Sequence, residues 1–254
     1  MTTDRASERR EQRREQLLTA AAQLVTERGV DGLTMHAIAE RVDCAVGTIY
    51  TYFPSKSALL AALMSDAVQL LLDTYRAASE FWSTELRDTP ADVAAAARVF
   101  AFTELFVSAQ QLHPEEFRFL QMLITTPETL IEPGDVASVL PSSLSFLAEV
   151  HDLLDAAVRV GTIREPEGRD DPLRRTLRWT GALHGVLLVA NVAHVSGLPD
   201  ADAYDPSVLS TEVTADLLSA WGASPEVVAD ARSVAGGLRP NAAPSTNPSG
   251  AVSA

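Results

Sequence analysis

The sequence predicts an all-α protein. Alternating apolar and polar runs bounded by turns, which are typical of strands, are scarce, whereas signals for the start of a helix recur along the chain. Proline stands repeatedly where the first residue of a helix would lie, a place that tolerates it because the missing N–H has no partner inside the helix. The six pairs are Thr89-Pro90, His113-Pro114, Leu140-Pro141, Asp171-Pro172, Asp205-Pro206 and Ser224-Pro225.

The first predicted element is a helix over about residues 8–28. Its apolar residues recur at helical spacing from Leu17 to Val25. Arg28 then places a cation in the last turn and Gly29 supplies a left-handed cap, so we expect the helix to end there.

Two short helices are expected next, followed by a long one. Thr34 is placed to cap the first short helix, and Asp43-Cys44 forms a tight turn before the second, Val46 to Phe53. A long helix is expected from Lys56 to about Ala78. Two short helices joined by a tight turn and preceded by a longer helix form a helix-turn-helix, the arrangement that places its second helix in the major groove of DNA.

The composition is that of an ordinary soluble protein, with 46% hydrophobic and 21% charged residues and a single cysteine, Cys44. One cysteine makes no intramolecular disulfide, and the charged start of the chain predicts no export signal. The longest apolar run, residues 181–195, is shorter than a membrane helix requires and predicts a buried helix. We therefore expect a cytoplasmic protein without a membrane partner. Residues 236–254, rich in Gly, Pro, Ser and Asn, predict a disordered tail.

Charge is distributed unevenly. The chain carries a net charge of −14, which by itself argues against a nucleic-acid partner. Residues 1–56, however, hold eight basic and eight acidic residues, so all of the excess acidity lies in residues 57–254. Residues 5–14 form a basic arm with a net charge of +3. Nineteen of the twenty basic residues are arginine, which makes the one lysine, Lys56, a position that needs an explanation.

The stretch from Leu17 to Leu60 resembles the N-terminal domain of the tetracycline-repressor (TetR) family of transcriptional regulators. The motifs that carry the resemblance are Glu27-Arg28-Gly29, Leu33-Thr34, Ile38-Ala39, Gly47-Thr48-Ile49-Tyr50, Tyr52-Phe53 and Ser55-Lys56. The resemblance implies a DNA-binding helix-turn-helix domain over residues 1–56. It also implies a helical ligand-binding and dimerisation domain over residues 57–235, before the tail.

The resemblance implies the residues that contact DNA. Thr34 and Lys56 match positions that contact phosphate in the family, and Gly47 lets the recognition helix approach the duplex closely. Ile49 and Phe53 are assigned to the three-helix core. The complete predicted DNA-binding set is Thr34, Val46, Gly47, Thr48, Tyr50, Thr51, Tyr52 and Lys56, with Arg10 and Arg13 from the basic arm. For the two tyrosines, burial in the core of the domain is the alternative.

The sequence departs from the family pattern at four positions. Asp43 replaces the usual turn glycine, at some cost in left-handed backbone, and Ala45 replaces the usual Ser or Thr cap, so that Asp43 is the remaining candidate for the cap. Val46 replaces a polar residue and is suited to a thymine methyl. Ala37 replaces the acid that would complete a capping box. These departures bear mainly on which operator sequence is bound.

The second domain is expected to bind a ligand and to dimerise. Gly181 and Gly185, four residues apart, would allow close approach of a partner helix; packing inside one subunit is the alternative. An apolar ligand site is predicted, with ordinary core packing as the alternative for each of its residues. That site comprises Phe102, Phe106, Phe119, Met122 and Trp179. The histidines lack metal-ligand spacing, so we expect neither a metal nor a cofactor.

The function expected from these features is that of a ligand-responsive, dimeric, DNA-binding transcriptional regulator. Its partners would be a double-stranded DNA operator, a second copy of the chain and a small-molecule inducer whose identity the sequence does not give. The favoured mode is a repressor that the inducer releases from a near-palindromic operator. A helical enzyme is disfavoured because the sequence shows no Ser/His/Asp set, phosphate loop or His-Glu-x-x-His motif. The main alternative is a protein-interaction adaptor that has lost operator binding.

Overall fold

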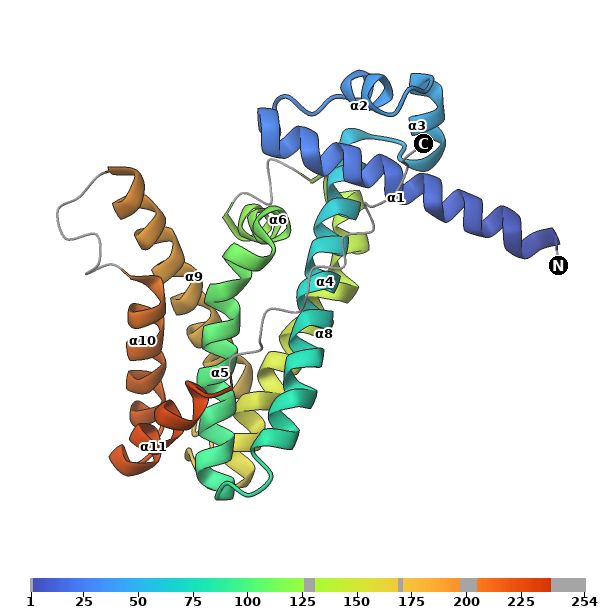
Figure 1. Cartoon of the computed structure of the whole chain (residues 1–254). Helices are drawn as coiled ribbons and strands as arrows, with labels where there is room; N and C mark the ends of the chain where they lie inside the picture. The colour runs from blue at the N-terminus through green and yellow to red at the C-terminus, as the bar shows by residue number, and fades with distance from the viewer. Residues whose placement is uncertain (1, 126–130, 169–170, 197–204, 239–254) are drawn as a thin grey trace, which may run out of the picture. The chain divides into compact units, whose positions relative to one another are not determined.

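The computed structural model describes residues 2–125, 131–168, 171–196 and 205–238, and each element in them is a helix (Figure 1). The predicted all-α class is therefore confirmed. The helices are α1 (Thr2–Arg28), α2 (Met35–Arg41), α3 (Val46–Tyr52), α4 (Lys56–Glu85), α5 (Ala91–Leu112), α6 (Pro114–Thr125), α8 (Pro133–Arg159), α9 (Pro172–Ser196), α10 (Pro206–Ala220) and α11 (Pro225–Ala235).

The basic arm is helical, which corrects the predicted start of the first helix. Helix α1 begins at Thr2, not near residue 8. Arg and Glu alternate along this stretch, and Arg14 Nη1 lies 3.3 Å from Glu11 Oε1, one turn earlier. Such pairs support a helix that has little else to pack against. At the other end, Gly29 has a φ of +71°, the left-handed cap that the sequence predicts.

Proline marks the start of several helices, as expected, although Pro90 precedes the first residue of α5, Ala91, and Pro141 is an error. Four helices begin at predicted prolines, namely α6, α9, α10 and α11, and the caps expected before α10 and α11 are formed by Asp205 and Ser224. Pro141 was expected to begin a helix but lies inside α8, which starts at Pro133. The carbonyl four residues before Pro141 belongs to Ala137. Because Ala137 is exposed, water can take the place of the missing N–H donor there.

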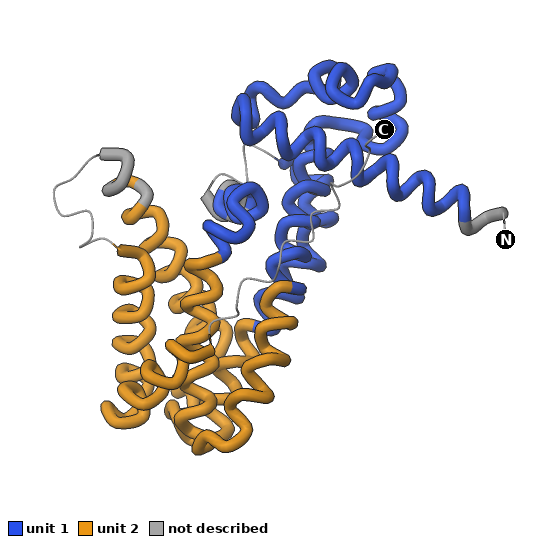
Figure 2. Tube along the Cα trace, viewed as in Figure 1, with its two compact units in different colours: residues 1–73, 109–149 blue, residues 74–108, 150–254 orange. Residues whose placement is uncertain are grey.

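Packing divides the chain into two compact units (Figure 2). Unit 1 comprises residues 1–73 and 109–149, and unit 2 comprises residues 74–108 and 150–254. This division by packing differs from the predicted functional division at residue 56, because α4 starts at Lys56 and contributes to both units. Of the predicted tail, residues 236–238 are described and Leu238 is buried, whereas residues 239–254 lie outside the described residues.

Within the described part of the chain, α4 is the one helix long and apolar enough to cross a membrane. More than half of its most apolar stretch is buried inside the protein, and its residues Leu59, Leu60 and Met64 belong to the hydrophobic core of unit 1. We therefore interpret α4 as a core helix.

Candidate nucleic-acid interface

The hydrophobic core of unit 1 fixes the orientation of the recognition helix. Ile49 and Phe53, which were assigned to the three-helix core, are 0% and 4% exposed and pack with apolar residues of α1, α2 and α4. Their burial confirms that assignment. Because successive helical side chains point 100° apart, Tyr50 and Thr51, which follow the buried Ile49, are turned outward.

Three α3 residues form the outward face. Tyr50 is 51% exposed, and Gly47 and Thr51 are exposed as well. A Cβ placed on Gly47 would have no heavy atom within 4 Å, so nothing within the protein requires glycine at this position. Thr51 Oγ1 donates to the carbonyl of Gly47 at 3.1 Å. The face that these residues present has no side chain at Gly47 and carries the exposed phenol of Tyr50.

The other predicted α3 residues are less accessible. Val46 and Tyr52 are half-buried and pack against the core of unit 1, and Thr48 is half-buried. For Tyr52 this packing favours the core alternative over a contact with DNA. For Val46 it reduces the surface left for a thymine methyl.

The turn before α3 is held by backbone rather than by a side-chain cap. Asp43 adopts a φ of +49°, the left-handed conformation expected there, and the Cys44 N–H donates to the carbonyl of Ala39 at 3.0 Å. The N-cap residue of α3 is Ala45, and it makes no side-chain hydrogen bond. The expectation that Asp43 supplies this cap was wrong, because the left-handed turn places Asp43 outside the cap position.

Thr34 caps α2 as predicted. Its Oγ1 accepts from the Ala37 N–H at 3.1 Å, and its backbone is extended, with φ −131° and ψ 153°. The hydroxyl acts only as an acceptor in this bond, so its own proton can still be donated to a phosphate oxygen. Thr34 is exposed.

Lys56 has a role that sequence reasoning did not find. Its Nζ donates to the backbone carbonyl of Val30 at 2.7 Å and so ties the start of α4 to the segment between α1 and α2. An ammonium group carries three N–H donors, which leaves others for a phosphate. Lys56 is the one lysine of the chain, which marked it as a position of interest. Its hydrogen bond to Val30 could not be predicted from the sequence.

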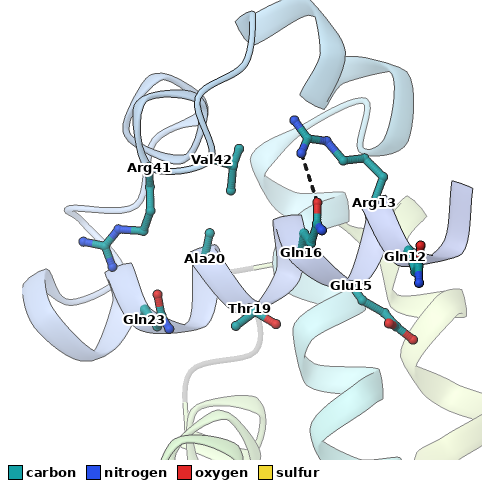
Figure 3. A pocket seen from close by; sticks show the side chains of 9 residues that line it. All are labelled: Gln12, Arg13, Glu15, Gln16, Thr19, Ala20, Gln23, Arg41 and Val42. Atoms are coloured by element: carbon teal, nitrogen blue, oxygen red, sulfur yellow. Dashed lines mark hydrogen bonds between the residues drawn. The ribbon is translucent and has the colours of Figure 1, made fainter. Parts of the chain in front are cut away.

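A polar groove lies between α1 and the end of α2, and the C-terminal end of the basic arm reaches it (Figure 3). The groove, of about 640 Å³, is lined by α1 residues that include Arg13 and by Arg41 and Val42 at the end of α2. Arg13 Nη1 donates to Gln16 Oε1 at 3.0 Å, and Arg10 is exposed. Arg41 binds the carboxylate of Glu27 through two nitrogens, and this hydrogen bonding lowers the pKa of Glu27. Glu27 is thereby held as an anion that orients Arg41.

The predicted ligand residues do not form one group. Phe102, Phe106 and Trp179 are buried in unit 2 and contact one another, with ring centroids 5.1 Å apart for Phe102 and Trp179. Phe119 belongs to the core of unit 1, and the side chain of Met122 lies outside the described residues.

Phe119 instead lines a hollow of about 270 Å³ in unit 1, between α1, α4 and α6. Asp66 lies at the edge of this hollow, where burial raises the pKa of its carboxyl group and Arg14, 3.6 Å away, opposes the shift. The ion pair therefore only partly offsets the loss of solvent around Asp66.

His184 is a residue of unit 2 that the sequence did not single out as a binding residue. Its ring packs edge-on against Phe106, with centroids 4.8 Å apart, and its Nδ1 lies 2.7 Å from the carbonyl of Thr180. Its Nε2 is buried without a hydrogen-bond partner in the described structure. A buried acceptor left unpaired typically costs about 1–3 kcal/mol.

Gly181 and Gly185 are exposed on α9, and a Cβ added to either would meet no atom within 4 Å. Close packing against these glycines within the described part of the subunit, the alternative considered from the sequence, is therefore wrong. Four apolar residues lie on the same face of α9, where they and the two glycines follow one another at spacings of three or four, and each of the four is at least half exposed. They are Leu173, Leu177, Leu188 and Val192.

A helix-turn-helix whose second helix exposes its polar face on a packed three-helix core defines a class of DNA-binding domain. Residues 17–63 match the family described as bacterial regulatory proteins, tetR family. The N-terminal part of the chain is therefore similar to the DNA-binding domain of TetR-family transcriptional regulators.

Similar proteins support the same assignment. The chain is 42% identical over 62 residues to the HTH-type transcriptional repressor KstR of Rhodococcus jostii, covering 24% of this chain and 29% of that protein. It is 37% identical over 79 residues to the class D tetracycline repressor protein of Escherichia coli, covering 30% of this chain and 35% of that protein. The matched part thus spans about a third of these curated relatives.

The fold over most of the chain resembles that of solved structures. The structure of RolR in complex with resorcinol aligns with a TM-score of 0.55 and 19% identity, over 93% of this chain and 100% of that one. The regulator FadR of Bacillus subtilis in complex with stearoyl-CoA aligns with a TM-score of 0.58 and 17% identity, over 81% of this chain and 97% of that one. At such identities the likeness shows the fold alone.

Proposed function

We propose that this protein is a ligand-responsive transcriptional regulator that binds a double-stranded DNA operator as a homodimer, as a repressor that a small molecule releases. The observation that carries the proposal is the exposed face of α3. Gly47, Tyr50 and Thr51 face outward, while Ile49 and Phe53 hold the helix on its core. In this arrangement the tyrosine can contact thymine methyls or phosphate, and the glycine allows close approach.

The homodimer is supported by the exposed apolar face of α9. Leu177 is 50% exposed and Leu188 is 54% exposed, with Gly181 and Gly185 between them on the same face. An exposed apolar face of this kind usually marks an interaction site, and glycines allow two helices to approach closely. A second copy of the chain fits because the same face on both copies gives a closed, two-fold interface. Two recognition helices about 34 Å apart would then read a near-palindromic operator.

Release by a small molecule is supported by the ligand complexes of similar folds. RolR was solved with resorcinol and FadR with stearoyl-CoA. Unit 2 of this chain holds the buried aromatic residues Phe102, Phe106 and Trp179. An inducer shifts the regulator between two states only if it binds one of them more tightly. A regulator of this kind acts in the cytoplasm, where its operator lies.

The test is binding of the purified protein to the DNA that flanks its own coding region, titrated across salt concentrations. Affinity should fall steeply as salt rises, because phosphate contacts release counterions. Tyr50→Ala should weaken binding about tenfold or more at fixed salt. Phe81→Ala is the matched control, since Phe81 is a 41% exposed aromatic residue on α4 within unit 2.

Two outcomes would count against the proposal. If the protein binds no DNA at any salt concentration, the interaction adaptor replaces the regulator. If Tyr50→Ala and Phe81→Ala bind DNA equally well, α3 is not the reading element.

A further inference from the structure

A continuous series of aromatic rings runs through unit 2, from α4 through α5 to α9. Phe102 contacts Tyr75, Phe106 and Trp179, with centroid separations of 5.5, 6.2 and 5.1 Å. Phe106 in turn contacts the ring of His184. The series therefore ends in an imidazole, the one ring among these five that changes charge near neutral pH.

Two tryptophans that take part in these ring contacts, Trp179 and Trp82, have satisfied N–H groups. Trp179 Nε1 donates to Thr214 Oγ1 and Trp82 Nε1 to the carbonyl of Leu238, both at 3.1 Å. His184 differs from them. A carbonyl oxygen can only accept, so the contact with Thr180 requires the proton to be on Nδ1, which leaves a lone pair on Nε2. That lone pair meets no donor in the described part of the chain.

The imidazole also lies at the border between the ring series and solvent. His184 as a whole is partly exposed, yet its Nε2 atom is covered, so the unpaired nitrogen is shielded from water in this structure. Phe106 packs against the ring edge-on. A small molecule that reached Nε2 would lie against Phe106 and would enter from the exposed side of His184.

We propose that His184 is the hydrogen-bond acceptor of a ligand site in unit 2, and that the ligand is an uncharged aromatic alcohol of the phenol class whose O–H binds Nε2 beside Phe106. This inference rests on the proposed ligand-responsive function and names the ligand class and the residue that selects it. The aromatic body of the ligand packs on the rings, and its hydroxyl supplies the donor that the protein lacks.

The charge state of His184 agrees with this ligand class. Burial lowers the pKa of the imidazole, so the ring is neutral and Nε2 remains an acceptor at neutral pH. A carboxylate ligand offers no donor to this atom. A methyl ether of the same shape offers none either, which gives a matched pair of probes.

The first experiment measures binding of 4-ethylphenol and of 4-ethylanisole to the full chain by isothermal titration calorimetry. The two probes differ only in the O–H donor, so 4-ethylphenol should bind at least about tenfold more tightly. A site that only packs apolar groups, or one in which an ordered water satisfies Nε2, would bind the two probes equally. Equal binding, or no binding of 4-ethylphenol, overturns the proposal.

The second experiment tests the residue. His184→Phe keeps a ring against Phe106 and removes Nε2, so the preference for 4-ethylphenol over 4-ethylanisole should disappear. His36→Phe is the control, since His36 is exposed on α2 in unit 1, and it should leave the preference intact. In the unsubstituted protein, with ¹⁵N-labelled histidine, 4-ethylphenol should shift the signal of the unprotonated Nε2 of His184 upfield. A signal that does not move overturns the assignment even if His184→Phe fails to fold.

Because both experiments are done without DNA, their failure is distinct from failure of the proposed function. A protein that binds its operator but does not distinguish the two probes is a regulator with another ligand. A protein that distinguishes the probes but binds no DNA keeps the ligand site and loses the proposed regulation.

Discussion

The ammonium group of Lys56 donates to the backbone carbonyl of Val30 at 2.7 Å, across 26 positions of the chain. The bond joins the first residue of α4 to the segment that leads into α2. The residue expected to contact the DNA backbone thus also holds together the domain that presents α3.

Lys56→Ala should therefore have two effects. Loss of the bond to Val30 should lower the free energy of unfolding by about 1 kcal/mol, and loss of a phosphate contact should reduce the slope of log affinity against log salt by about 1. Urea titration measures the first effect and DNA binding across salt measures the second. Lys56→Arg, which keeps the charge and N–H donors, should retain most of the salt slope. An unchanged slope in Lys56→Ala would show that the lysine is structural only.

Ala45→Ser should stabilise the protein. Ala45 has extended N-cap geometry, with φ −68° and ψ 140°, but no side-chain oxygen to accept from the first turn of α3. A serine there should raise the free energy of unfolding by about 1 kcal/mol, measured by urea titration. Ala45→Val, which adds side-chain atoms but no acceptor, should give no such gain. A serine variant no more stable than the valine variant would mean that the end of α3 is already satisfied.

Leu188→Glu should weaken the proposed homodimer. Leu188 is 54% exposed in one subunit, so the substitution should leave the fold intact, while a carboxylate in an apolar interface is costly. We expect dimerisation to weaken by about 100-fold, equivalent to about 2.8 kcal/mol, in sedimentation equilibrium. Val208→Glu, at a 48% exposed position on α10, is the control. Equal dimerisation of both variants would place the interface elsewhere.

The stability of the protein should depend on pH through His184. Burial lowers the pKa of this group in the folded state, so the unfolded chain, with a pKa of about 6.5, binds a proton that the folded chain does not. Stability should consequently fall as the pH drops below about 6.5, toward the lower pKa of the folded state. His184→Phe should flatten this part of the curve in thermal unfolding from pH 7.5 to 5, whereas His36→Phe should not. If the stability of His184→Phe depends on pH in the same way as that of the unsubstituted protein, other groups cause the dependence.

Local signals predicted the helices and the outward face of α3 well. Gly29 and the prolines before α6, α9, α10 and α11 act within one turn of the chain, so their effect can be read from neighbouring residues. The prediction that a helix begins at Pro141 was wrong, because a proline can also lie inside a helix where the carbonyl that loses its N–H partner is exposed. Which side chains meet across the fold was not predictable in this way.

The bonds from Lys56 to Val30 and from Trp179 to Thr214, and the separation of Phe119 from Phe102, depend on tertiary packing between residues far apart in sequence. Residue type suggested an apolar site but could not say which aromatic residues share a core. His184 was noticed only as a histidine without metal spacing. Whether its Nε2 finds a hydrogen-bond donor depends on the tertiary packing around it, which the sequence does not give.

The hydrogen bond from Trp82 to the carbonyl of Leu238 attaches the segment that follows α11 to α4. Leu238 is 4% exposed and the Trp82 indole is fully buried. A deletion that removes Leu238 would therefore leave the Trp82 N–H buried without this acceptor. The three residues after α11 are therefore kept in place by a side chain 156 positions earlier in the chain.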